Sequence, residues 1–171
     1  MTSDPATPTR LVLARHGETE WSRTGRHTGR TDIPLTDLGR EEAQRLGTVL
    51  SGRSFSRVVS SPLARATETA RLAGFGDRLE VDDDLREWDY GWYEGRTRVE
   101  IAKDVPGWTV WTHPIVGGES LEAVGHRADR VIDRLLSTAG DVLLFSHGHF
   151  LRVLAARWIA ATPVTGSRLE L

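Results

Sequence analysis

The stretch LVLARHG at residues 11–17 joins four consecutive apolar residues to an arginine, a histidine and a glycine. A run of four apolar residues is typical of a short strand in a sheet that is covered on both faces. The stretch DVLLFSHGH at residues 141–149 has the same form, and its residues 141–146 predict a further strand. Both stretches therefore predict buried strands that polar residues follow directly.

Helix-like segments alternate with strand-like ones through the first half of the chain. Thr36 suits the N-cap of a helix that runs to about Leu50, because apolar residues follow it near helical spacing. Residues 58–60 predict another strand. The helix after that strand is predicted to run through Ala73, with Pro62 in its first turn, where a proline is tolerated.

The second half of the chain continues this alternation. Residues 79–81 are a weaker strand candidate, and residues 82–95 are irregular and aromatic. Ser120 suits the N-cap of a long helix, and another helix is predicted over residues 150–160. The long helix carries one apolar stripe, formed by Leu121, Val124, Ala128, Val131, Leu135 and Leu136. This order of elements predicts an α/β fold with three layers, in which helices cover both faces of a mostly parallel sheet.

Length and composition limit the class of protein. A chain of 171 residues with 39% apolar and 27% charged residues is long enough to bury the core of one domain. We expect that domain over residues 10–171, after a flexible segment at residues 1–9. The net charge of −2, without a basic stripe, argues against nucleic acid as a partner. The expected partners are small molecules or other proteins, and the sequence carries no signal for an oligomeric state.

The residue types that are missing exclude several kinds of chemistry. The chain has no cysteine, so disulfides, thiolate metal sites and cysteine nucleophiles are excluded. The first ten residues, MTSDPATPTR, contain no apolar run of the kind found in a signal peptide. The longest apolar runs are strand-sized and too short to cross a bilayer. The expectation is a cytoplasmic protein without a membrane partner.

Polar residues follow three of the predicted strands. Ligands of open α/β sheets bind outside the carboxyl ends of the strands, and parallel strands bring those ends to one edge. We therefore expect two arginines and two or three histidines to converge there. The residues concerned are Arg15 and His16 after the first strand, Ser60, Ser61 and Arg65 after the second, and Ser146, His147, Gly148 and His149 after the last.

This convergence predicts a site for an anion. Each part alone is more typical of a surface turn, a hydrogen-bonded histidine or a solvated charge, but clustered cations repel one another unless an anion lies between them. A metal site is the main alternative, since imidazole is a common metal ligand. The guanidinium groups of Arg15 and Arg65 argue against it, because they repel a divalent cation and match phosphate oxygens in a bidentate way. Glycine turns that open into helix N-termini add N–H donors.

Phosphate monoesters are among the slowest substrates to hydrolyse in water. A covalent intermediate divides the reaction into two steps with lower activation barriers. A neutral imidazole is a competent nucleophile, so His16 is placed to attack phosphorus while Arg15 and Arg65 hold the oxygens. His147 is placed to donate a hydrogen bond to the same oxygens. The leaving alkoxide needs a proton from a carboxylic acid. The residues alone do not choose that acid, and Glu87, Glu94 and Glu119 remain open.

Four spaced blocks resemble the signature of the histidine phosphatase superfamily, in its phosphoglycerate mutase-like branch 1. The blocks occur in the family order and span residues 11–157. The run VDDDLREWDYGWYEG at residues 81–95 is similar to bacterial acid phosphatases and sedoheptulose-bisphosphatase-like members of the group. The blocks are LARHGE at residues 13–18, SSPLARATETA at residues 60–70, LREWDYG at residues 85–91 and SHGHFLR at residues 146–152.

The resemblance assigns roles to individual residues. It implies that His16 accepts the phosphoryl group, that Arg15 and Arg65 clamp it, that His147 is the second histidine of the phosphate pocket, and that Glu87 is the general acid. It implies no cofactor and no metal. The aromatic neighbours of Glu87, which are Trp88, Tyr90, Trp92 and Tyr93, either favour its protonated form or only pack the loop. The implied substrate-binding residues are Arg15, Ser22, Thr28, Gly29, Arg65, Glu87, His147 and Gly148.

Three departures favour a phosphatase over a mutase. Mutases of this family carry asparagine where this chain has Ser22, and again where it has His149. Their longer insertion with paired arginines is not recognisable between residues 98 and 118. These features help to return the phosphoryl group to a sugar acid, so their absence favours transfer to water. Phosphoglycerate mutase-type transfer stays as the alternative, and a module that binds phosphate without turnover is a third.

Two further features of the sequence bear on stability and on substrate choice. The resemblance implies one more strand beyond residues 166–169, whereas this chain stops at Leu171, as in a naturally short or a truncated version. Five tryptophans are candidates for reading the leaving group, although Trp108 and Trp111 are equally candidates for packing. The five are Trp21, Trp88, Trp92, Trp108 and Trp111.

Overall fold

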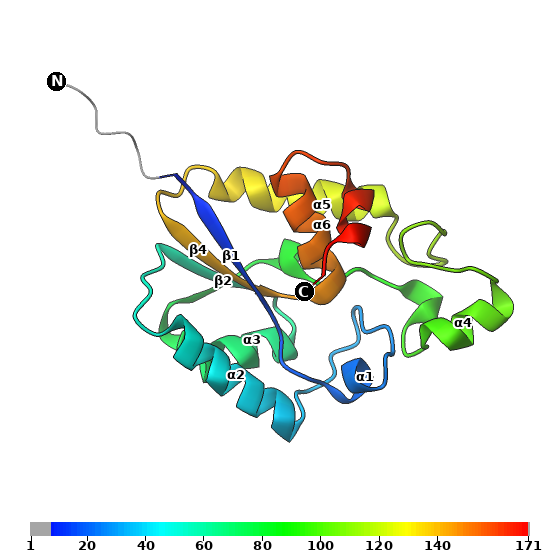
Figure 1. Ribbon diagram of the computed structural model, residues 1–171, viewed down its shortest axis with the longest axis horizontal. Coiled ribbons are helices and arrows are strands. Elements are labelled where there is room, and N and C mark those ends of the chain that lie inside the picture. The colour runs from blue at the N-terminus through cyan, green and yellow to red at the C-terminus, as the bar shows by residue number, and fades with distance from the viewer. Residues whose placement is uncertain (1–7, 171) are drawn as a thin grey trace.

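A four-stranded parallel sheet lies at the centre of the protein, whose computed structural model describes residues 8–170 (Figure 1). The strands are β1 (Arg10–Arg15), β2 (Arg57–Ser60), β3 (Leu79–Val81) and β4 (Asp141–Ser146). Their order in the sheet is β1-β4-β2-β3, so the strand that comes last in the sequence lies inside the sheet. All three strand pairs are parallel, and the carboxyl ends of the strands therefore lie at one edge.

The register of the inner strands brings three strand ends level with one another. Arg15 pairs with Ser146, and Ser60 pairs with Phe145. Backbone hydrogen bonds continue the pairing one residue further, from the N–H of His16 to the carbonyl of Ser146 at 3.0 Å and from Ser61 to Phe145 at 2.9 Å. The turns that follow β1, β2 and β4 thus begin side by side.

Helices cover both faces of the sheet, as the sequence predicts. Helices α2 and α3 lie on one face, and α5 and α6 lie on the other (Figure 1). The short helices α1 and α4 lie beyond the carboxyl edge of the sheet. The bounds are α1 (Glu20–Arg23), α2 (Asp37–Leu50), α3 (Ala64–Leu72), α4 (Arg98–Asp104), α5 (Leu121–Leu135) and α6 (Gly148–Trp158), with 3₁₀ turns at Gly76–Arg78, Asp83–Leu85, Gly91–Tyr93 and Pro163–Arg168.

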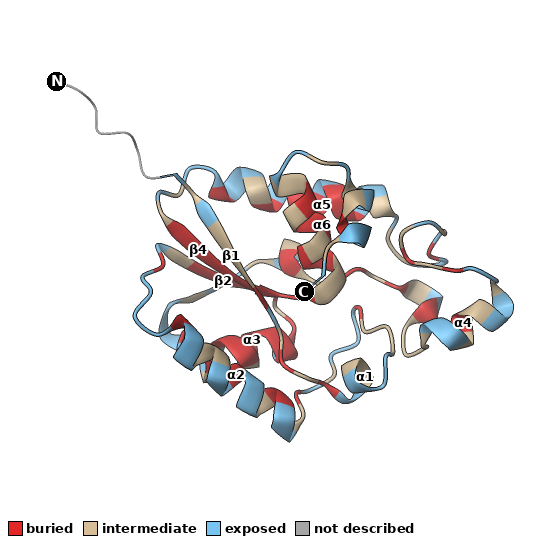
Figure 2. Ribbon diagram, in the orientation of Figure 1, coloured by how far each residue is buried: buried red, intermediate tan, exposed pale blue. Residues whose placement is uncertain are grey.

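Strand β4 contributes side chains to two separate hydrophobic cores. Val142 and Leu144 belong to the core beneath α5 and α6, whereas Leu143 and Phe145 belong to the core beneath α2 and α3. All four side chains are fully buried, and Figure 2 shows β4 as one continuous buried strand. Burial on both faces explains why this strand is an unbroken apolar run instead of an alternating one.

Helix α3 begins later than the sequence predicts. Its first residue is Ala64, so Pro62 precedes the helix instead of occupying its first turn. The carboxylate of Asp32 accepts the backbone N–H of Ala64 at 2.9 and 3.0 Å, and this distant cap selects the start. The helix ends at Leu72, with Ala73 as the C-cap.

Helix α6 begins earlier than predicted, at Gly148, and it ends at Trp158 instead of residue 160. A carboxylate from another loop, that of Glu87, accepts the N–H of Phe150 at 2.8 Å, so the first turn is capped from outside the helix. Leu136 also differs from its prediction, because it follows the last residue of α5 and is 58% exposed instead of lying on the buried stripe.

Helices α1 and α4 are absent from the predicted elements. They contain only 4 and 7 residues, which is too short for an apolar periodicity to show. Each is stabilised by a capping box, formed by Thr19 with Ser22 and by Thr97 with Glu100. Local capping therefore produces both helices without an amphipathic pattern.

Residues 1–7 of the predicted flexible segment 1–9, together with Leu171, lie outside the described residues. The hydroxyl of Thr9 donates to the carbonyl of Thr138 at 2.5 Å, so the described end of that segment contacts the loop before β4. Within residues 8–170, none of the helices has the length and apolar character that a bilayer crossing needs.

The double burial of β4 leads to a stability prediction. We expect Leu144→Ala to lower the free energy of unfolding by about 2 to 5 kcal/mol, because the side chain is fully buried. Leu136→Ala removes the same atoms from a side chain that is 58% exposed, and we expect a loss below about 0.5 kcal/mol. Urea unfolding followed by circular dichroism measures both, and equal losses contradict the assignment of the core.

Candidate active site

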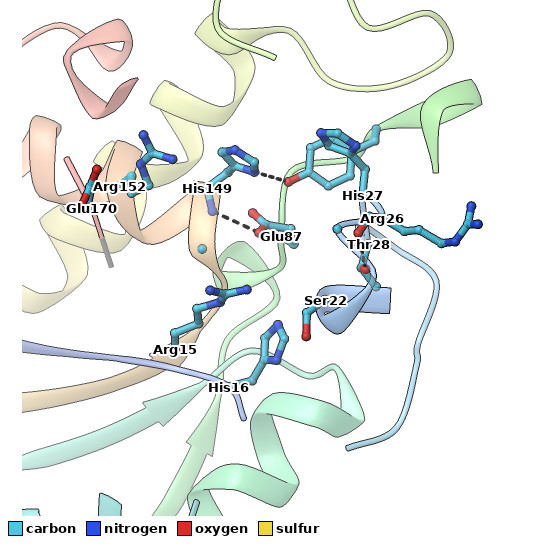
Figure 3. A pocket seen from close by; sticks show the side chains of 13 residues that line it. Arg15, His16, Ser22, Arg26, His27, Thr28, Glu87, His149, Arg152 and Glu170 are labelled. Carbon is cyan, nitrogen blue, oxygen red and sulfur yellow. Dashed lines mark hydrogen bonds between the residues drawn. The ribbon is translucent and has the colours of Figure 1, made fainter. Parts of the chain in front are cut away.

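A cavity of about 390 Å³ opens at the carboxyl edge of the sheet. Its walls come from the turn after β1, the loop over residues 22–28, the segment around Glu87 and the first turns of α6 (Figure 3). Seven other lining residues were not among the predicted catalytic and substrate-binding residues. Six of the predicted site residues line the cavity, namely Arg15, His16, Ser22, Thr28, Glu87 and Gly148.

His16 presents one free ring nitrogen to this cavity. Its Nδ1 lies 2.7 Å from the carbonyl oxygen of Gly17, and because a carbonyl only accepts, Nδ1 carries the ring proton. In the neutral imidazole the lone pair is then on Nε2. Figure 3 shows the ring of His16 beside Arg15 and pointing into the space between Ser22 and Glu87. Nε2 is therefore available to a group bound in the cavity.

Burial, together with the guanidinium groups of Arg65 and Arg15, lowers the pKa of His16 from its usual 6.5 to about 3. The hydrogen bond to Gly17 opposes these effects without cancelling them. A lowered pKa means that the neutral form predominates at all pH values above about 3. His16 thus has the protonation state that a nucleophile requires.

Arg65 is fully buried and holds a loop in place. Its guanidinium donates to the carbonyls of Thr28 at 3.1 Å, Gly29 at 2.9 Å and Thr31 at 2.9 Å, and its Nε donates to His147 at 3.2 Å. Burial also lowers its pKa below the usual arginine value. Arg65 consequently lies behind His16 and does not line the cavity, whereas the sequence predicts it as a direct clamp.

His147 is also fully buried behind His16, with 5.1 Å between the two ring centroids. Its Nδ1 accepts the hydrogen bond from Arg65, so Nε2 carries the ring proton and donates to the hydroxyl of Ser61 at 2.8 Å. Burial and the charge of Arg65 hold the pKa of His147 well below its usual value. Donation from His147 to a phosphate oxygen, as the sequence predicts, requires the contact with Ser61 to open.

Of the three candidate carboxylates, Glu87 is the one that lines the cavity. It is 6% exposed and accepts the backbone N–H groups of Trp88 at 2.9 Å, Phe150 at 2.8 Å and His149 at 3.1 Å. Two of these donors belong to the first turn of α6, whose dipole favours a negative charge there. The other two candidates lie elsewhere: Glu94 binds the backbone of Arg30, and Glu119 pairs with Arg127.

The aromatic residues near Glu87 do not all surround it. Trp88, Tyr90 and Tyr93 are buried, whereas Trp92 is 77% exposed and points to solvent. Tyr90 alone among these four lines the cavity, and its hydroxyl lies 2.6 Å from Nδ1 of His149. Of the two alternatives that the sequence left open for these aromatic residues, apolar surroundings for Glu87 do not describe Trp92, which lies in the 3₁₀ turn over Gly91–Tyr93 and is exposed.

The remaining predicted substrate-binding residues have structural roles. The hydroxyl of Ser22 completes the capping box of α1. It accepts the backbone N–H of Thr19 and donates its proton to the carbonyl of Thr19. Gly29 is buried behind the loop, and a Cβ there would lie 2.3 Å from the carboxylate of Glu94. Gly148 is the first residue of α6 and lies against the guanidinium of Arg15.

The far wall of the cavity includes two histidines to which the sequence analysis assigned no catalytic or substrate-binding role, although it expected His149 at this edge of the sheet. His27 and His149 have nearly parallel rings with centroids 6.3 Å apart. Burial lowers the pKa of both, to about 4 for His149, so both are neutral. His149 belongs to the SHGHFLR block and His27 directly precedes the predicted substrate-binding residue Thr28, so their positions next to predicted site residues were the signal in the sequence. Arg152 ends the SHGHFLR block, whereas Arg26 and Glu170 lie outside the quoted blocks.

None of the five tryptophans lines this cavity within residues 8–170. Trp108 is buried against Tyr93 and His27, and Trp111 packs beneath the guanidinium of Arg152 at 4.9 Å. Trp88 is fully buried, and its indole N–H donates to Glu119. Trp88, Trp108 and Trp111 therefore serve in packing.

The charges at the cavity suit an anion. Arg15 lines the cavity and makes no ion pair with any residue in the range 8–170. The free nitrogen of His16 and the first turn of α6 lie beside it. Over the same described range, no three histidine, aspartate or glutamate side chains are grouped as metal ligands. An anionic electrophile would meet a fixed positive charge, a neutral nucleophile and a carboxyl group together.

Comparison with known proteins gives a consistent result. The chain is 45% identical to an acid phosphatase of Mycobacterium tuberculosis, covering 95% of this chain and 81% of that protein. It is 35% identical to sedoheptulose 1,7-bisphosphatase of Saccharomyces cerevisiae, covering 90% and 69%. A solved structure from Mycobacterium tuberculosis superimposes with a TM-score of 0.88 at 44% identity, covering 94% of this chain and 85% of the other.

The pattern that defines a large enzyme family matches residues 11–171, which is nearly the whole chain. The parallel sheet between two helical layers and the arrangement of the four motif blocks agree with that match. This chain belongs to the histidine phosphatase superfamily, branch 1.

Proposed function

We propose that this protein hydrolyses phosphate monoesters of small metabolites through a phosphohistidine intermediate on His16. The observation that carries the proposal is the orientation of the His16 ring: Nδ1 is bound to Gly17, and the free Nε2 faces the cavity beside Arg15. Membership of the histidine phosphatase superfamily supports the same reaction.

In the first step the substrate phosphate binds beside Arg15 and the N-terminus of α6. Nε2 of His16 attacks phosphorus, the nitrogen–phosphorus bond forms, and the bond from phosphorus to the leaving oxygen breaks. The positive charge that develops on the ring is shared with the Gly17 carbonyl through Nδ1–H. Arg65, although buried, lowers the electrostatic cost of bringing the phosphate charge close to His16.

Glu87 is proposed to supply the proton to the leaving oxygen, because it is the one of the three candidate carboxyl groups that lines the cavity, at the N-terminus of α6. A bound phosphate adds negative charge next to this carboxyl and favours its protonated form. In the second step the ionised Glu87 accepts a proton from water as that water attacks the phosphohistidine. Phosphate leaves, and His16 returns to its neutral form.

The cavity of about 390 Å³ is of the size that takes a small metabolite. Relatives named acid phosphatase and sedoheptulose 1,7-bisphosphatase support phosphorylated small molecules as the substrate class. The net charge of −2 supports a partner other than nucleic acid. A cytoplasmic location and a single domain over residues 10–171 are part of the same proposal.

The first prediction tests the nucleophile. We expect His16→Ala to lower turnover of p-nitrophenyl phosphate by about a thousand-fold or more, because the variant lacks the imidazole nitrogen that faces the cavity beside Arg15. Acid-labile radioactive phosphate should be trapped on the unaltered protein and not on the variant. His126→Ala, at an exposed histidine of α5, is the control and should keep both properties. Label that persists in His16→Ala would move the nucleophile to another residue.

The second prediction tests the acid. We expect Glu87→Gln to slow hydrolysis of alkyl phosphates by about 100-fold or more, since their leaving groups need a proton. The same variant should slow p-nitrophenyl phosphate by less than about ten-fold, because p-nitrophenolate leaves without one. Steady-state kinetics on the two substrates provide the comparison. Equal slowing of both substrates removes Glu87 from the acid role.

The third prediction concerns pH. Because the pKa of His16 is lowered to about 3, its nucleophilic form should persist in acid and disappear only as the pH falls through about 3. Nitrogen-15 NMR of the substrate-free protein should show the His16 ring protonating near that pH. A midpoint near the ordinary histidine value of about 6.5 contradicts the proposed environment.

A further inference from the structure

We propose that Thr69 is a positioning residue that keeps Nε2 of His16 free for attack, and this inference rests on the proposed function. Thr69 lies on α3, is 1% exposed and does not line the cavity. It contacts the backbone next to the nucleophile and the backbone of Arg65. None of the comparisons or the sequence motifs assigns it a role.

One hydroxyl group joins the two backbones. Oγ1 of Thr69 accepts the N–H of Gly17 at 3.1 Å and donates its own proton to the carbonyl of Arg65 at 2.7 Å. The directions follow from chemistry, because a backbone N–H only donates and a carbonyl only accepts. The N–H of Gly17 is thereby attached to α3, on the helix turn that follows Arg65.

The carbonyl of the same residue, Gly17, holds the ring of His16. It accepts the proton of Nδ1 at 2.7 Å, and this bond decides which ring nitrogen has the lone pair. Gly17 therefore carries one hydrogen bond to Thr69 and one to His16. The orientation of its carbonyl, and with it the tautomer of the nucleophile, depends on where its N–H is anchored.

The surroundings of Gly17 leave little alternative to this anchor. The residue is buried, and a Cβ placed on it would lie only 2.2 Å from the carbonyl oxygen of Gly39 in α2. The turn is thus pressed against α2 on one side and bonded to α3 on the other. Within residues 8–170, Thr69 is the one acceptor found for the Gly17 N–H.

Removal of the hydroxyl leaves this buried donor unpaired, and the chain gains by rotating the Gly17 N–H toward another acceptor or water. Such a rotation weakens the bond from Nδ1 to the Gly17 carbonyl. The proton is then free to move to Nε2, and an imidazole protonated at Nε2 has no lone pair to offer to phosphorus. The effect falls on the chemical step and leaves the binding of substrate largely unaltered.

A purely structural role is the competing explanation, and α3 contains a matched control. Thr67 is 7% exposed on the same helix, and its hydroxyl donates to the carbonyl of Ala64 at 3.2 Å. It has no bond to the turn after β1. Thr67→Val and Thr69→Val therefore remove the same group from similar surroundings, and they differ in the link to Gly17.

The experiment compares Thr69→Val, Thr69→Ser and Thr67→Val in the full chain. We expect Thr69→Val to lower kcat for p-nitrophenyl phosphate, and the rate of phosphohistidine formation, by about ten-fold or more with little change in KM. Thr69→Ser keeps the hydroxyl and should recover most of this loss. Nitrogen-15 NMR without substrate should show the His16 proton on Nδ1 in the unaltered protein, and partly on Nε2 in Thr69→Val.

Three results overturn the proposal: a kcat for Thr69→Val equal to that of Thr67→Val, an unchanged His16 tautomer, or no recovery in Thr69→Ser. If Thr69→Val does not fold, Thr69→Ala removes the same hydroxyl with less bulk and is compared in its place. If Thr69→Ala also fails to fold, hydrogen exchange of the Gly17 amide is measured in the folded Thr69→Ser variant. Retained protection of that amide supports the proposal, and loss of protection counts against it. Failure of the proposed function is distinguishable, since the unaltered protein would then form no phosphohistidine, while the NMR comparison still reports on Thr69.

Discussion

The site depends on the parallel pairing of β4 with β1 on one side and β2 on the other. Arg15 pairs with Ser146, and Ser60 pairs with Phe145, so the turns after three strands that are distant in sequence begin level with one another. A shift of one residue in β4 would turn its side chains to the opposite faces. Both faces of β4 are fully buried in separate cores, which makes any such shift costly and keeps the turns in register.

The buried guanidinium of Arg65 organises what this register brings together. A charge in the interior requires partners, and Arg65 finds them in the carbonyls of Thr28, Gly29 and Thr31 and in the ring of His147. The same hydrogen bonds place the loop that forms one wall of the cavity. The charge also contributes to the lowered pKa of His16. One arginine thus shapes the wall, holds a histidine and keeps the proposed nucleophile neutral.

Several residues of the proposed active site also stabilise the helices around it. Glu87 caps α6 through the N–H groups of His149 and Phe150 while it lines the cavity. This arrangement ties the position of the proposed acid to the helix that also supplies an anion-binding N-terminus. Thr69 is the counterpart on the other face of the sheet, since a helix residue anchors the turn of the nucleophile. Helix packing and chemistry are therefore coupled on both faces.

The sequence by itself determined the strands, the layered fold and the residues at the strand ends, because apolar runs and the polar residues after them are local patterns. The residue types alone left Glu87, Glu94 and Glu119 open and only the family resemblance implied Glu87, whereas the fold shows that Glu87 is the one of the three that lines the cavity. It also placed Arg65 and His147 behind His16, through a hydrogen bond between residues 82 positions apart. Burial, tautomers and lowered pKa values arise from such distant contacts, and no local pattern of residues encodes them.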